Sequence, residues 1–119
     1  GAGRVSVWNR TAARAEELAD RFGAESVTTP APADIVINTT SVGLSGEPLG
    51  ALPVDGLLVP GTTVVDFVYR QGGTELIEAA AAAGCATVDG LELLVRQGAL
   101  SLEHWTGRQP DLDVMRAAC

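Results

Sequence analysis

The sequence predicts an α/β fold, with a parallel β-sheet flanked by helices. Short apolar runs alternate along the chain with alanine- and glutamate-rich segments of helical periodicity, an order typical of parallel sheets. One run, Asp34–Asn38, is apolar at successive positions, as in strands that are covered on both faces. Gly23 and Gly84 directly follow two of the helical segments, where a left-handed residue commonly ends a helix. We therefore expect one domain built around a parallel sheet.

The expected strands cover residues 5–8, 34–38, 62–68 and 85–88, a short extended piece covers 25–28, and the expected helices cover 11–22, 74–83, 91–105 and 110–117. Thr11 fits the N-cap of the first helix. Leu18 and Phe22 lie one turn apart and predict the face by which this helix packs. The connection from Thr39 to Gly61 is longer than most loops, and such loops often carry function.

The second half of the chain contains the clearer burial signals. Cys85 stands at the front of a strand that we expect to be buried. Pro110 fits the first turn of the final helix, where its missing N–H costs nothing. The core face of helix 91–105 is predicted by three leucines, Leu93, Leu94 and Leu100.

The length and composition limit the classes of protein to which this chain can belong. With 119 residues and 46% apolar residues, the chain can bury the modest core of one domain. Its net charge of −7 argues against a nucleic-acid partner. No apolar run approaches the roughly 20 residues that span a membrane and no signal-peptide pattern is visible, so we expect a cytoplasmic protein. Cys85 and Cys119 are expected to be unpaired thiols, and no metal site is predicted.

The first strand runs directly into a doubly basic helix start. In dinucleotide-binding folds, an acidic side chain at the end of the second strand accepts from the 2′-hydroxyl of NAD. Asn9 and Arg10 take that place here, and guanidinium groups bind a 2′-phosphate that a carboxylate would repel. Arg14, one turn after Arg10, and the free N–H groups behind Thr11 add to this anion site. The pattern favours NADP over NAD, although a polar turn with two solvated arginines has the same spacing.

Four blocks follow one another in the chain: Asn9-Arg-Thr-x-x-Arg14, Asp34-Ile-Val-Ile-Asn-Thr-Thr-Ser-Val-Gly43, Val65-Asp-Phe-Val-Tyr69 and Val88-Asp-Gly-Leu-Glu-Leu-Leu-Val-x-Gln97. In this order, and over essentially the whole length, they resemble the carboxy-terminal, NADP-binding half of shikimate dehydrogenases. The resemblance implies a Rossmann-like sheet and NADP as the cofactor. Its 2′-phosphate would be held by Asn9, Arg10, Thr11 and Arg14.

The resemblance also implies a nicotinamide site. Four polar residues stand where a central strand meets its loop, the edge at which open α/β sheets bind ligands, namely Asn38, Thr39, Thr40 and Ser41. By resemblance, the nicotinamide ribose lies along this edge. Phe67 would line the nicotinamide where the family often has Leu or Met, and Gly90, without a Cβ, would let the backbone approach it. Asn38 and Ser41 also fit the simpler role of satisfying a turn.

Tyr69 and Gln97 are implied to reach the substrate. Without the resemblance, Tyr69 is an aromatic residue at the rim of the core and Gln97 a solvated helix position. His104, the only histidine, receives no role from the resemblance.

Two features depart from the family pattern. Gly1-Ala2-Gly3 begins like a phosphate-binding glycine loop, but a strand follows it at once where that fingerprint requires a helix. We therefore expect the first strand and first helix of the fold to be missing. In the strand order 3-2-1-4-5-6 the first strand is central, so two free strand edges are expected, with self-association as one outcome.

The second departure concerns catalysis. The resemblance implies a parent enzyme that uses NADPH to reduce 3-dehydroshikimate reversibly to shikimate, on the way to aromatic amino acids. A lysine and an aspartate of an amino-terminal substrate domain would handle the proton, and this chain has no lysine. We therefore expect weak NADP binding and no turnover from the chain alone. A non-catalytic NADP-binding module and a quinate/shikimate dehydrogenase are the alternatives.

Overall fold

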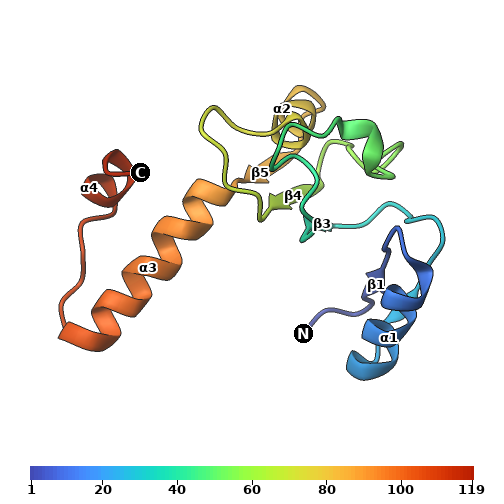
Figure 1. Cartoon of the computed structure of the whole chain (residues 1–119), viewed down its shortest axis with the longest axis horizontal. Coiled ribbons are helices and arrows are strands. Elements are labelled where there is room, and N and C mark those ends of the chain that lie inside the picture. Colours follow the sequence, from blue (N-terminus) through green and yellow to red (C-terminus); the bar gives the residue numbers. More distant parts are fainter.

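A computed structural model describes all residues, 1–119, as an elongated molecule of 44 × 32 × 28 Å (Figure 1). Its strands are β1 (Ser6–Val7), β2 (Glu25–Ser26), β3 (Ile35–Asn38), β4 (Thr63–Asp66) and β5 (Ala86–Val88). Its helices are α1 (Ala12–Phe22), α2 (Glu75–Ala82), α3 (Gly90–Thr106) and α4 (Leu112–Ala117), with a short 3-10 helix at Leu49–Ala51. Each expected element is present, and the strands are shorter than expected. The prediction that Pro110 lies in the first turn of the final helix is wrong, because Asp111 caps α4 through its side chain and the helix begins at Leu112.

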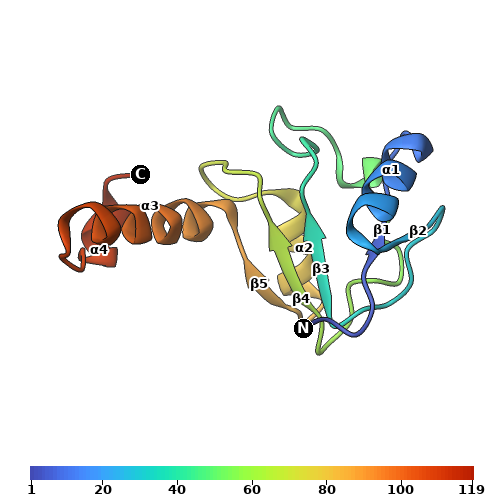
Figure 2. The same ribbon diagram turned by 90° about the horizontal axis from the view of Figure 1, so that it is seen from below.

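All strands pair in parallel, but they form two separate sheets. One sheet contains β1 and β2, and the other has the order β3-β4-β5. Figure 2 shows β1 beside β3, with these two strands as the facing edges of the two sheets. The predicted parallel α/β fold is confirmed, and so are the two free strand edges.

Each sheet has one helix packed on it. α1 packs on β1 and β2, whereas α2 packs on β4 and β5. In Figure 1, α2 lies above the larger sheet and α1 below β1. α3 packs against α4 and extends away from both sheets (Figures 1 and 2). No helix combines the length and hydrophobicity that crossing a membrane requires.

The core lies between the larger sheet and α2. Val64 of β4 packs there against Leu76 and Ala80 of α2, and all three are buried. Partly buried residues complete this cluster, namely Val36, Leu49, Leu52, Val54, Leu58 and Cys85. The long loop before β4 therefore contributes to the core.

The expectation that residues 34–38 are covered on both faces is wrong. Ile35 and Ile37 of β3 are 58% and 55% exposed. β3 is an edge strand, and α2 covers only the face that bears Val36. The apolar run predicted the strand, but not which neighbours would cover it.

Two predicted packing faces of helices are also wrong. α1 buries Ala15 and Ala19, while Leu18 and Phe22 are exposed. The two-stranded sheet under α1 is too narrow to cover its large side chains. On α3 the buried side chains are Val95 and Ala99, and the leucines predicted as a core face are partly or fully exposed, namely Leu93, Leu94 and Leu100. These leucines are accessible because α3 extends away from the sheets.

β5 is likewise less buried than expected. It forms the outer edge of its sheet, and Ala86 and Thr87 are exposed. Cys85, directly before it, is half-buried and Cys119 is exposed, and both are free thiols as expected.

Candidate functional site

A buried hydrogen-bond network joins the carboxyl ends of β3 and β4. Asp66, the last residue of β4, is 0% exposed. Its carboxylate accepts from Asn38 Nδ2 at 2.9 Å, the Val68 backbone N–H at 3.0 Å and the Thr74 hydroxyl at 2.6 Å. Thr74 is the N-cap of α2 and also accepts from the Ile77 N–H. Because a buried carboxylate needs such donors, the network fixes both strand ends and the start of α2 to one another.

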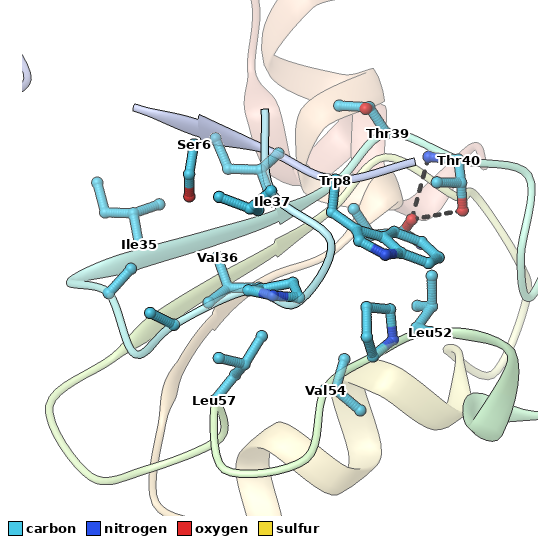
Figure 3. A pocket seen from close by; sticks show the side chains of 16 residues that line it. Ser6, Trp8, Ile35, Val36, Ile37, Thr39, Thr40, Leu52, Val54 and Leu57 are labelled. Atoms are coloured by element: carbon cyan, nitrogen blue, oxygen red, sulfur yellow. Dashed lines mark hydrogen bonds between the residues drawn. The ribbon is translucent and has the colours of Figure 1, made fainter. Parts of the chain in front are cut away.

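The network continues into the loop after β3. Asn38 Oδ1 accepts from the backbone N–H of Thr40 at 3.0 Å and from its hydroxyl at 2.7 Å, drawn as dashed lines in Figure 3. Asn38 Nδ2 also donates to the Val42 carbonyl at 3.3 Å. Asn38 is only 5% exposed, whereas Thr39 and Ser41 are exposed. Asn38 and Thr40 therefore shape the loop, and Thr39 and Ser41 are accessible to a ligand.

The end of β1 carries positive charge without an acidic partner. Arg10 and Arg14 are exposed, neither takes part in a salt bridge, and the first turn of α1 contains no acidic residue. Asn9 Oδ1 accepts from the Thr11 backbone N–H at 2.9 Å. Thr11 occupies the predicted N-cap position, but its side chain makes no capping bond. The first N–H groups of α1 therefore stay available to an anion.

One cavity lies between these two groups of residues. Its volume is about 150 Å³, and most of its lining is apolar. Trp8, directly before Asn9, lines it from one side, and Asn38, Thr39 and Thr40 line it from the other (Figure 3). The structure thus brings the end of β1 and the β3 loop to the same cavity.

Gly90, the first residue of α3, allows a close approach of two backbone segments. A Cβ built on Gly90 would lie 2.3 Å from the Val68 carbonyl oxygen and 2.6 Å from the Tyr69 nitrogen. The missing side chain therefore lets the first turn of α3 pack on the segment after β4. In this structure the space freed at Gly90 faces protein, and its role toward a cofactor stays a prediction. Phe67, in the adjoining segment, is exposed.

The two residues predicted to reach a substrate both form hydrogen bonds within the chain. The Tyr69 hydroxyl donates to the Cys119 carbonyl at 2.8 Å. Gln97 lies on the exposed part of α3, and its Nε2 donates to the Leu94 carbonyl at 3.2 Å. No hydrogen bond links Tyr69 to Gln97. Each side chain is instead held by its own backbone carbonyl partner, Cys119 for Tyr69 and Leu94 for Gln97.

Glu92, in the first turn of α3, forms a salt bridge with Arg116 of α4. Its two carboxylate oxygens accept from Arg116 Nε at 2.9 Å and Arg116 Nη2 at 3.1 Å. Arg96 pairs with the same carboxylate. The hydrogen bonds from Arg116 and then Arg96 lower the pKa of Glu92 to about 2. The ion pairs hold the end of α4 to the start of α3, and the Tyr69–Cys119 bond ties the same end of the chain to the segment after β4.

The sequence did not predict four of these residues, namely Asp66, Thr74, Glu92 and Arg116. For Asp66 a signal existed, because it is the one acidic residue within the otherwise apolar run from Val64 to Val68. The sequence indicates Thr74 only as the start of a helix. The Glu92–Arg116 pair joins residues 24 apart in sequence, and no local pattern indicates such a contact.

Comparison with known proteins finds similarity to shikimate dehydrogenases. Residues 90–119 match the family described as the shikimate 5′-dehydrogenase C-terminal domain. Shikimate dehydrogenase (NADP(+)) of Ruegeria sp. strain TM1040 is 38% identical over 121 residues, which cover 95% of this chain and 44% of that protein. The chain thus spans less than half the length of the relatives it matches.

Solved structures give the same result. The crystal structure of shikimate dehydrogenase from Aquifex aeolicus superposes with a TM-score of 0.81 at 33% identity, covering 97% of this chain and 44% of that one. The Thermus thermophilus shikimate 5-dehydrogenase, solved in complex with NADP(H) and shikimate, superposes with a TM-score of 0.75 at 37% identity, again covering 97% and 44%.

Proposed function

We propose that this chain, which is homologous to the carboxy-terminal part of shikimate dehydrogenases, forms the NADP-binding part of an enzyme that interconverts 3-dehydroshikimate and shikimate. The observation that carries this proposal is the exposed pair Arg10 and Arg14 at the start of α1, with no acidic residue in that turn. An NAD-binding site typically has an acidic residue there.

The 2′-phosphate of NADP would bind at this helix start. Arg10 and Arg14 supply positive charge, and the uncapped N–H groups of α1 supply backbone donors. Asn9 supports the same ligand, because the Thr11 N–H occupies its oxygen and the side-chain amide N–H groups can serve an anion. A ribose 2′-hydroxyl would gain much less from this set of donors.

The nicotinamide end would lie at the β3 loop. Thr39 and Ser41 offer exposed hydroxyl groups to the ribose, and Asn38 and Thr40 hold the loop that carries them. Phe67 would supply an apolar surface beside the ring. Bound NADPH supplies the hydride for carbonyl reduction.

We further propose that Tyr69 and Gln97 contact the substrate from the carboxyl edge of the sheet. The Tyr69 hydroxyl donates a hydrogen bond to the backbone carbonyl of Cys119, and its oxygen can still accept one from a substrate hydroxyl. The resemblance implies that a lysine and an aspartate handle the proton that accompanies the hydride. Because the chain has no lysine, we propose that residues outside these 119 perform this transfer. We propose a cytoplasmic location, where NADPH and a small polar substrate are both available.

The test is calorimetric titration of NADP and of NAD into the chain and its Arg10→Ala and Arg14→Ala variants. We expect binding of NADP in preference to NAD, and a loss of about tenfold or more in NADP affinity in each variant, because a charge-assisted bond contributes about 1.5–3 kcal/mol. Arg21→Ala is the matched control, since Arg21 lies in the last turn of the same helix.

The control should bind NADP as the unmodified chain does. Equal affinity for NADP and NAD, or equal losses in all three variants, would contradict the proposed site. NADPH oxidation by the isolated chain in the presence of 3-dehydroshikimate would contradict the assignment of proton transfer to residues outside it.

A further inference from the structure

Tyr69 is held at two points, one on its backbone and one on its side chain. The first turn of α3 packs on its backbone, since a Cβ built on Gly90 would lie 2.6 Å from the Tyr69 nitrogen. Its hydroxyl donates to the Cys119 carbonyl at 2.8 Å. Tyr69 and Cys119 are 50 residues apart, so the direction of the hydroxyl depends on where the tertiary structure places Cys119.

The backbone of Cys119 is tied to Arg116. Cys119 lies two residues after α4, and its N–H donates to the Arg116 carbonyl at 3.3 Å. The N–H of Ala118 donates to the same carbonyl. These bonds close the residues after Arg116 into a tight turn. A displacement of Arg116 would therefore displace the carbonyl that accepts from Tyr69.

The side chain of Arg116 links α4 to α3. Its Nε donates to one carboxylate oxygen of Glu92 at 2.9 Å, and its Nη2 donates to the other at 3.1 Å. Glu92 is itself fixed in the first turn of α3, where its backbone N–H donates to the side chain of Asp89 at 2.8 Å. A guanidinium and a carboxylate joined by two hydrogen bonds have a defined mutual orientation. The pair thus fixes the direction as well as the position of Arg116.

The other contacts of α4 are weak and non-directional. α4 turns back along α3 (Figure 1), but it contains no buried residue, and Val114 is 65% exposed. Only Leu112 and Met115 contribute half-buried apolar side chains. Apolar contact has no preferred direction, and a helix of six residues is not stable without tertiary contacts. The orientation of the end of α4 therefore depends on the Glu92–Arg116 pair.

We propose that Glu92 and Arg116 are positioning residues for the Tyr69 hydroxyl. They act through α4 and the Cys119 carbonyl, and neither side chain forms a hydrogen bond with Tyr69 itself. The contacts form a closed ring, because α3 touches the backbone of Tyr69 and also holds the helix that receives its hydroxyl. The importance of this ring for a substrate rests on the proposed function, in which Tyr69 contacts the substrate.

The test uses the full chain labelled with ¹³C at the Cζ atom of tyrosine. Tyr69 is the only tyrosine, so the spectrum contains a single resonance, and its shift depends on the hydrogen bonding of the hydroxyl. In Arg116→Ala and in Glu92→Ala we expect this resonance to move to the position of solvated N-acetyltyrosinamide. The double variant should move it no further than either single variant, because both residues act through one contact.

Arg96→Ala is the matched control. Arg96 pairs with the same Glu92 carboxylate but lies on α3, so its removal takes away an equal charge without releasing α4. It should leave the Tyr69 resonance in place. Arg116→Lys keeps a positive charge beside Glu92, and its Tyr69 resonance should stay closer to the original position than that of Arg116→Ala.

A merely structural role of the pair would lower the stability of the chain but leave the Tyr69 resonance of the folded state unmoved. Amide shifts of β3, β4 and β5 check that each variant is folded. An unmoved resonance in Arg116→Ala, or an equal movement in Arg96→Ala, would overturn the proposal. The measurement needs neither cofactor nor substrate, so its failure is distinct from a failure of the NADP titration that tests the proposed function.

Discussion

The side-chain amide of Asn38 donates a hydrogen bond of 2.9 Å to the buried carboxylate of Asp66, and these two residues stand opposite each other in the β3–β4 register. The last residue pair of the β3–β4 ladder is therefore linked through its side chains, in addition to the backbone hydrogen bonds between the two strands. Through Thr40 on one side and Thr74 on the other, it fixes the loop and the helix start that border the proposed nicotinamide site.

Replacing Asp66 with alanine should strongly destabilise the chain. The change leaves the Asn38 amide, the Thr74 hydroxyl and the Val68 N–H without their acceptor, and each buried unpaired group costs about 1–3 kcal/mol. We expect the free energy of unfolding in urea to fall by at least about 2 kcal/mol. Asp55→Ala, at an exposed loop position, is the control and should change it by less than about 0.5 kcal/mol. Similar losses in both variants would argue against the network.

Replacing Gly90 with alanine should displace α3. The new Cβ would meet the Val68 carbonyl oxygen at 2.3 Å, and its nearest neighbours are backbone atoms of Val68 and Tyr69, which cannot move aside as the end of a flexible side chain can. We expect a loss of about 2 kcal/mol or more in unfolding free energy, with altered amide shifts at residues 67–69. In Gly98→Ala the nearest atom is the flexible Met115 Cε at 3.3 Å, so that variant should stay near the stability of the unmodified chain. A well-folded Gly90→Ala chain with unchanged shifts would refute this packing.

The docking of α4 should depend on acidic pH through Glu92. Ion pairing with Arg116 and Arg96 lowers the pKa of Glu92 from 4.5 to about 2. A lowered pKa in the folded state means that the stabilisation is complete above about pH 4.5 and is lost as the pH falls toward 2. The Nε–H resonance of Arg116, followed by NMR, should report this loss.

Glu92→Gln provides the control for that titration. The amide cannot ionise, so the Arg116 resonance should no longer change between pH 4.5 and 2 through this pair. The comparison with Glu92→Gln is necessary because Glu47 also has a lowered pKa, owing to hydrogen bonds from backbone N–H groups. Protonation of Glu47 at acidic pH could otherwise be mistaken for protonation of Glu92. An identical pH profile in both proteins would assign the transition to another group.

Replacing Asn9 with aspartate should shift the cofactor preference. The carboxylate can still accept from the Thr11 N–H, but it places a negative charge where the 2′-phosphate would bind. We expect the ratio of NADP affinity to NAD affinity to fall by about tenfold or more, measured by calorimetry. Asn9→Ser, which adds no charge, should change this ratio less. An unchanged ratio in Asn9→Asp would place the phosphate elsewhere.

The order of the elements could be predicted from local sequence alone. Gly23 ends α1 in the left-handed conformation with φ of 67°, and Thr74 caps α2 through its hydroxyl. These signals act between residues a few positions apart, so they do not depend on the rest of the fold. The alternation of strands and helices then limits the fold to a parallel α/β arrangement.

Burial could not be predicted in the same way. The run Ile35–Asn38 is equally compatible with a central or an edge strand, because only the neighbouring strands and helices decide which face is covered. The pairing of Asn38 with Asp66, 28 residues away, and of Glu92 with Arg116 likewise depends on long-range packing.

The sequence by itself determined the element order, the glycine-terminated end of α1 and its basic start, because each follows from interactions within a few residues. The tertiary structure alone decided that the strands form two sheets, that Ile35 and Ile37 are exposed and that Asp66 is buried with three donors. Strand pairing and side-chain burial depend on contacts between segments that are far apart in the sequence. A local stretch of sequence therefore does not determine them.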